Sequence, residues 1–142
     1  FLKNIKMDKK IMYRHVRIID ETKMMLNILT GSKYTSIYDI PQKKAGTICL
    51  TYDKKEIRVG LAMCSPKDNF SRRIGRELSY MRSVSIPFTV IDISELESQD
   101  DDFVFNYCIK ELNRIEKYVA SNFRELQKHL GFFLNMLTKL NQ

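Results

Sequence analysis

The sequence has few of the residues that interrupt regular structure: five glycines and three prolines in 142 residues. With 44% hydrophobic and 29% charged residues, this scarcity excludes collagen-like, low-complexity and fully disordered chains. Apolar runs stay well short of the roughly 18 residues of a membrane span, so we expect no transmembrane helix, and no cleaved secretory signal is recognised. A chain of this length is expected to form one domain, with at most a small appendage.

Cysteine and histidine are also scarce. Cys49, Cys64 and Cys108 are odd in number and lack CxxC spacing, which favours reduced thiols in a cytosolic compartment. His15 and His129 are too far apart in the sequence to support a metal site or a catalytic triad. The glycines are too scattered for a phosphate-binding loop. We therefore expect no cofactor and no metal.

One segment partly matches an enzymatic pattern. Many metal-dependent nucleases have an aspartate upstream of a Glu-x-Lys strand, and here Asp53 precedes Glu56 and Arg58. Arg58 stands where the lysine is expected, and arginine cannot release a proton at neutral pH. A small metal-dependent nuclease is therefore the least favoured hypothesis. The sequence favours a non-enzymatic protein and leaves enzymatic activity undecided.

The net charge of +7 is unevenly distributed. Residues 1–17 carry six lysines and arginines against one aspartate, and residues 66–82 carry five against two acidic residues. Residues 83–109 contain six acidic side chains and no basic one. Basic clusters attract polyanions and speed the encounter with them. The chain is therefore polarised, and two basic segments are candidates for contact with a polyanion.

Alternating apolar residues predict strands at 11–20, 46–52, 56–64 and 86–94. The second and third are joined by a short polar connection and predict a β-hairpin, with Ile48, Leu50 and Val59 on its apolar face. The high apolar content of residues 86–94 indicates an inner strand. Residues 21–30 could form a short helix that Gly31 stops, and a short strand is possible around residues 34–38. The fold class expected is α+β with a mainly antiparallel sheet.

A basic helix is predicted over residues 66–82. Ser65 can cap it, Pro66 suits its first position and Asp68 can return a capping bond. An apolar stripe at helical spacing predicts its buried face, formed by Phe70, Ile74, Leu78 and Met81. The outer face then carries the arginines, and Arg73 and Glu77 are spaced to form an ion pair.

Two glycines indicate close contacts. Gly60, in the predicted strand 56–64, marks a bulge or a close backbone approach. Gly75 lies inside the basic helix, where glycine costs about 1 kcal/mol relative to alanine. We expect a close helix–sheet contact to offset this cost, and a close approach to a phosphate backbone is the alternative.

Residues 102–141 have a helical pattern with a possible break near 121–122. We divide the chain into a basic arm (1–10), an α+β core (11–101) and this helical segment (102–142). From Val119 the apolar spacing follows a heptad. The favoured interpretation is a helix packed on its own sheet, and the alternative is a homodimer interface formed by Phe123, Leu126, Leu130, Phe133 and Leu137.

Residues 60–82 resemble a segment of small bacteriophage-encoded accessory proteins, most of which have no assigned role. The shared pattern is a strand, then a Pro-Lys-Asp-x-Phe-Ser-x-x-Ile-Gly-Arg helix start, then a basic helix. It is matched here by Pro66, Lys67, Asp68, Phe70, Ser71, Ile74, Gly75 and Arg76. The resemblance implies a phage origin and action in a bacterial cytoplasm, and it implies no enzymatic activity.

The first functional hypothesis is a non-enzymatic, phage-type regulatory protein that binds nucleic acid or a nucleic-acid-bound host complex. Arginine suits phosphate because its planar fork binds bidentately, and a tyrosine can stack on a base. The candidate residues are Lys9, Lys10, Lys67, Arg72, Arg73, Arg76, Tyr80 and Arg82. The alternative is an inhibitor of a host or defence enzyme, such as an anti-CRISPR or anti-restriction factor, that uses the acidic residues 95–102 and a helical surface.

Overall fold

The computed structural model describes residues 9–31, 33–34, 36, 39–64 and 70–128. Its elements are β1 (Lys10–Ile19), α2 (Glu21–Leu29), β2 (Gln42–Tyr52), β3 (Glu56–Met63), α3 (Arg72–Ser85), β4 (Thr89–Asp92) and α4 (Asp101–Ser121). The four strands form one antiparallel sheet in the order β1-β2-β3-β4. The predicted α+β fold with a C-terminal helical segment is confirmed.

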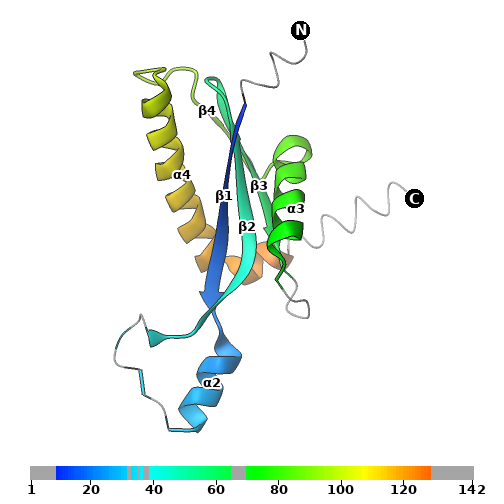
Figure 1. Ribbon diagram of the computed structural model, residues 1–142, viewed down its shortest axis with the longest axis vertical. Helices are drawn as coiled ribbons and strands as arrows, with labels where there is room; N and C mark the ends of the chain where they lie inside the picture. The colour runs from blue at the N-terminus through cyan, green and yellow to red at the C-terminus, as the bar shows by residue number, and fades with distance from the viewer. Residues whose placement is uncertain (1–8, 32, 35, 37–38, 65–69, 129–142) are drawn as a thin grey trace, which may run out of the picture.

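The sheet lies between two helices, with α4 on one face and α3 on the other, and α2 lies beyond one end of the sheet (Figure 1). The face toward α4 holds the main hydrophobic core, and the predicted inward residues Ile48, Leu50 and Val59 are fully buried there. The buried stripe of α4 consists of Val104, Cys108, Leu112, Ile115 and Val119. Strands and α4 therefore share one core. Within the described part of the chain, no helix is long and apolar enough to cross a membrane.

The predicted hairpin is confirmed, and β2 is longer than expected. Asp53 Oδ1 holds the turn by accepting hydrogen bonds from the backbone amides of Lys55 (2.7 Å) and Glu56 (2.9 Å). A register shift between Val16 and Arg17 lets β2 continue along β1 as far as Gln42. The predicted strand 11–20 and the helix 21–30 are also present, as β1 and α2.

Two other strand predictions have different outcomes. The strand at 86–94 is shorter than expected and lies at the edge of the sheet, because β4 pairs only with β3. The inner position predicted for it is wrong: apolar density alone does not report how many neighbours a strand has. The possible strand around 34–38 cannot be compared, because residues 35, 37 and 38 lie outside the described residues.

Helix α3 begins later than predicted. Ser71 is its N-cap, and its Oγ accepts the backbone N–H of Ile74 at 3.3 Å. The start at residue 66 is wrong for this helix, because Phe70 and Ser71 are not helical. The expected capping residues Ser65, Pro66 and Asp68 lie outside the described residues.

The buried face of α3 is not the predicted apolar stripe. Ile74 and Met81 are 57% and 56% exposed, whereas Ser79 and Ser83 are fully buried. A Cβ added at Gly75 would lie 2.3 Å from Thr47 Oγ1, so α3 meets the sheet through its smallest residues. This contact confirms the close helix–sheet approach expected of Gly75. Small residues bring the helix so close that larger side chains can only lie beside the contact.

The helical C-terminal segment breaks where predicted. α4 ends at Ser121, and Asn122 Nδ2 donates to the Tyr118 carbonyl at 2.8 Å before residues 123–128 resume a helix. Phe123 is only 7% exposed, and Leu126 packs against the same core. For these two residues the contacts match a helix packed on its own sheet, and the dimer interface stays a prediction. The remaining interface residues, Leu130, Phe133 and Leu137, lie outside the described residues.

Candidate nucleic-acid interface

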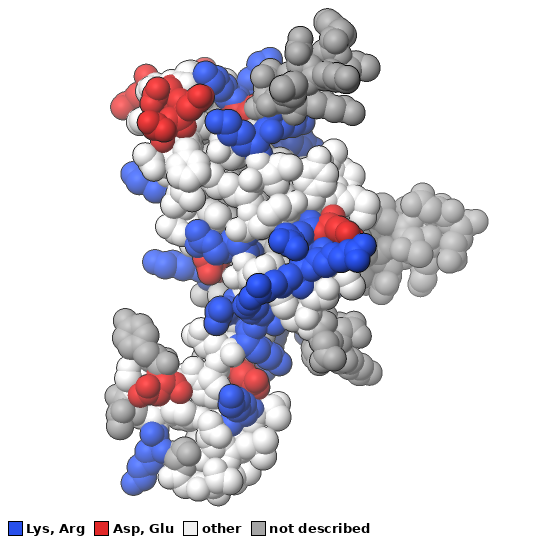
Figure 2. Space-filling view, viewed as in Figure 1, with Lys and Arg blue, Asp and Glu red and all other residues white. Residues whose placement is uncertain are grey.

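Basic side chains from three elements converge on one face of the molecule. They are Arg17 on β1, Lys44 on β2, and Arg72 and Arg76 on α3, and together they are called the basic face below. Figure 2 shows a band of lysine and arginine side chains across the middle of the view, over the region where β1 and α3 lie in Figure 1. The spacing of Arg72 and Arg76 places them on one flank of α3. The densest group of acidic side chains lies apart from this band, around the start of α4, and other acidic side chains are scattered over the view.

His15 lies at the centre of the basic face. Its Nδ1 is 3.0 Å from Thr47 Oγ1, and its ring meets Phe70 edge-on with centroids 5.2 Å apart. Partial burial lowers the pKa of His15, and the surrounding cations lower it further: Lys44, Arg72, Arg76 and Arg17. Desolvation and the positive charges of Arg72 and Arg17 also lower the pKa of Lys44. The face therefore carries mutually repelling positive charge.

Within the part of the chain that the structure describes, the four cations of the basic face have no carboxylate partner, unlike Arg14, Arg58 and Arg114. Among the described residues, ion pairs are formed by Arg14 with Glu116, Arg58 with Glu56 and Arg114 with Glu111, and none involves the basic face. An anion placed there would relieve the repulsion among these cations, which contributes to the lowered pKa values of His15 and Lys44. The arrangement suits a negatively charged ligand.

The structure separates the predicted site residues into different environments. Arg73 forms the predicted ion pair with Glu77 at 3.3 Å, on the outer surface of α3. Arg82 Nη1 donates to the Leu61 carbonyl at 2.8 Å, and burial lowers its pKa, so this arginine ties α3 to β3. A binding role for Arg82 stays a prediction, and this contact commits one of its N–H donors to the sheet. Lys67 lies outside the described residues.

Lys9 and Lys10 lie at the end of β1 that is remote from Arg17. Lys10 pairs with Tyr52 at one end of β1, whereas Arg17 pairs with Lys44 near the other. At about 3.3 Å per residue, about 23 Å of strand separates Lys10 from Arg17. Lys9 and Lys10 therefore do not belong to the basic face, although both are exposed.

Sequence reasoning missed Tyr13, His15, Arg17 and Lys44 as parts of the site. A signal was present, because Tyr13, His15 and Arg17 alternate along β1 and must share one side of the sheet. The pattern could not say that α3 packs on that side, because the pairing of a helix with a sheet face is not a local property of the chain.

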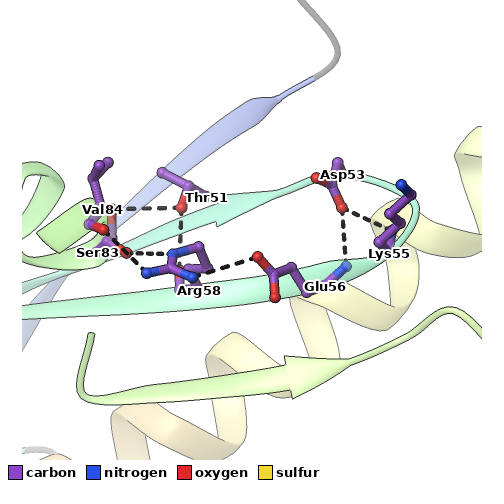
Figure 3. A network of polar contacts seen from close by, with 7 residues as sticks. All are labelled: Thr51, Asp53, Lys55, Glu56, Arg58, Ser83 and Val84. Carbon is purple, nitrogen blue, oxygen red and sulfur yellow. Dashed lines mark hydrogen bonds and ion pairs between the residues drawn. The ribbon is translucent and has the colours of Figure 1, made fainter. Parts of the chain in front are cut away.

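The residues of the nuclease-like pattern have structural partners (Figure 3). Arg58 Nε donates to the Ser83 carbonyl at 2.9 Å and Nη2 to the Val84 carbonyl at 3.0 Å, so it caps the C-terminus of α3. Its Nη1 is 3.4 Å from Glu56 Oε1, and Asp53 holds the hairpin turn. Across the residues described here, no group of three or more His, Cys, Asp or Glu side chains is arranged to hold a metal ion.

The buried cysteine thiols are also poorly suited to nucleophilic chemistry. Burial raises the pKa of Cys49 to about 11 and that of Cys108 to about 12. A thiol with such a pKa stays protonated at neutral pH, and the thiolate is the reactive form. These two residues act as core side chains.

A cleft adjoins the basic face. Its lining includes Lys44 and Phe70 on one side, the start of α2, and residues 120–125 on the other. Arg124 pairs with Glu21 across it, and Gln127 Nε2 donates to the Cys64 carbonyl at 2.7 Å. The cleft thus extends the surface beside the basic face toward α2 and the residues that follow α4.

Comparison of the chain with protein-family models, with curated proteins and with solved structures found no match.

Proposed function

We propose that this protein is a non-enzymatic, phage-type regulatory protein that binds nucleic acid through the basic face. The observation that carries the proposal is the convergence of Arg17, Lys44, Arg72 and Arg76, none of which has an ion-pair partner among the described residues. A polyphosphate backbone supplies the missing negative charge, and release of its counterions drives the binding.

The local likeness to phage accessory proteins supports the proposed origin and a bacterial cytoplasmic setting. Two residues of the shared sequence pattern help to place α3: Ser71 caps the helix, and Gly75 packs against Thr47. Arg76 is exposed beside them. The pattern thus combines residues that place α3 on the sheet with one that a ligand can reach.

The test is fluorescence anisotropy with labelled polynucleotides over a series of salt concentrations. We expect Arg72→Ala/Arg76→Ala to weaken binding at least tenfold and to reduce the slope of log K against log salt by about 2, one for each lost phosphate contact. The matched control is Lys110→Ala/Lys117→Ala, which removes the same charge from exposed positions of α4. Equal losses in the two variants, or none in the first, would contradict the proposal.

A second candidate is an inhibitor that binds a host or defence enzyme. It is favoured by α2, which buries none of its residues and exposes Met25, Leu26, Ile28 and Leu29. Such an apolar helix surface is typical of a protein-binding site. Affinity capture from a bacterial host, with and without nuclease treatment, separates the two candidates: a protein that stays bound after nuclease treatment favours the inhibitor. Metal-dependent cleavage of DNA or RNA would overturn both.

A further inference from the structure

Two exposed tyrosines extend the basic face along the side of α3. Tyr80 follows Arg76 by one helical turn, as Arg76 follows Arg72. Tyr13 lies on β1, two residues before His15, and therefore points to the same side of the sheet. Tyr13 is 40% exposed and Tyr80 is 42% exposed, so each ring offers surface to a ligand.

The sheet register brings the two tyrosines together. Tyr13 pairs with Cys49, Cys49 pairs with Gly60, and Gly60 lies beneath the backbone of Ser79, next to Tyr80. Electrostatic coupling agrees with this placement: burial raises the pKa of Tyr13, Cys49 and Tyr80 raise it further, and the charge of Arg76 opposes them. An arginine thus lies close to two aromatic rings, on a surface that continues to Arg72 and Arg17.

This combination fits one form of nucleic acid. In a duplex the bases are already stacked on one another, and a protein that binds the backbone alone needs only cations. Unpaired bases expose their faces, and proteins bind them by stacking on aromatic side chains while arginine and lysine follow the phosphates. Surface tyrosines among unpaired arginines are therefore expected in a site for single strands.

Building on the function proposed above, we infer that the basic face binds single-stranded nucleic acid, with bases stacked on Tyr13 and Tyr80 and phosphates held by Arg76, Arg72 and Arg17. The ring of Tyr80 is the part that matters for stacking, and its hydroxyl is dispensable. Single-stranded RNA and DNA share this chemistry and differ by the 2′-hydroxyl.

The experiment measures anisotropy with three labelled probes of equal length: oligo(U), oligo(dT) and a DNA duplex. We expect one or both single strands to bind more tightly than the duplex. Tyr80→Ala should weaken single-strand binding about tenfold, and Tyr80→Phe should restore it. Phe105→Ala, which removes an exposed ring from α4, is the matched control and should change nothing.

A second measurement detects stacking directly. The chain contains no tryptophan, so Tyr80→Trp introduces a single tryptophan, which is excited selectively at wavelengths that tyrosine does not absorb. Single strands should quench its fluorescence, and a duplex should not. Equal binding of the duplex, with no effect of Tyr80→Ala but a loss in Arg72→Ala/Arg76→Ala, would overturn this inference and leave the proposed function standing. Failure of all three probes to bind would overturn both.

Discussion

The backbone of α3 lies directly on Gly60 of β3: a Cβ added at Gly60 would lie 1.8 Å from the Ser79 carbonyl oxygen and 2.4 Å from the Ser83 nitrogen. Both atoms belong to the helix backbone, so no side-chain rotation can make room. The predicted close approach at Gly60 is therefore confirmed, and it fixes how the helix that carries Arg72, Arg76 and Tyr80 lies on the sheet.

Gly60→Ala should destabilise the protein by about 3 kcal/mol, because α3 must lift from the sheet to accept a methyl group. Urea unfolding followed by circular dichroism measures the loss. Gly75→Ala is the matched comparison, since its Cβ would meet the side chain of Thr47 and not the backbone. Rotation of Thr47 can relieve that clash at the cost of its bond to His15, and alanine gains about 1 kcal/mol of helix propensity. If the Gly60→Ala protein were as stable as the Gly75→Ala protein, the backbone of α3 would not lie directly against Gly60.

Arg58→Met should lower the free energy of unfolding by about 1–2 kcal/mol, because it leaves the Ser83 and Val84 carbonyls without their donor at the end of α3. The control is Arg73→Met, which breaks only an exposed pair with Glu77 and should cost less than about 0.5 kcal/mol. Both values come from urea unfolding at the same salt concentration. Equal losses in the two variants would argue against a capping role for Arg58.

The stability of the protein should depend on His15 below neutral pH. Burial and the basic face hold the folded-state pKa below the unfolded value of 6.5, so the unfolded state binds the proton more readily. The contribution of His15 is therefore complete above pH 6.5 and is lost as the pH falls through the folded-state pKa.

Unfolding free energies measured between about pH 5 and pH 8 should fall on the acid side, and His15→Asn should reduce that fall. Asparagine keeps a polar group beside Thr47 and does not titrate. His129→Asn serves as the control for the other histidine. An unchanged pH profile in His15→Asn would mean that neither burial nor the repulsion from Lys44 and Arg72 lowers the pKa of His15.

Phe123→Ala should destabilise the monomer by about 3 kcal/mol, because its ring is buried in the core shared by the strands and α4. We expect the same sedimentation coefficient for both proteins across a range of concentrations. If wild-type stability instead rises with protein concentration and the variant loses that dependence, Phe123 belongs to a homodimer interface after all.

Much of the fold could be read from local patterns. Alternation located β1 and the β2–β3 hairpin, because the face toward α4 carries large apolar side chains and the face toward α3 carries mostly polar or small ones, such as Thr47, Thr51 and Gly60. The break after Ser121 followed from the capping signal at Asn122, although the side chain of Asn122 bonds backward to Tyr118. These features depend on residues close together in sequence.

The candidate site was predicted only in part. Arg72, Arg76 and Tyr80 were found because they share one helix and helical spacing reveals a common flank. Arg82 has the same chemical character, yet its guanidinium donates to the Leu61 carbonyl and ties α3 to β3, which no spacing could show. Arg17 and Lys44 are part of the site because the β1–β2 register pairs them with each other. The packing of α3 on the sheet then places Arg72 near both.

The sequence by itself determined the elements of this protein and their order, its uneven charge and the two glycines that permit close packing. Only the tertiary structure decided which face of α3 is buried, since that choice depended on the shape of the sheet beneath it. Glycine at positions 60 and 75 with buried Ser79 and Ser83 lets backbone approach backbone, and the apolar side chains Ile74 and Met81 are left exposed. Local hydrophobicity favours burial of a stripe, but steric fit between two surfaces decides which stripe meets the sheet.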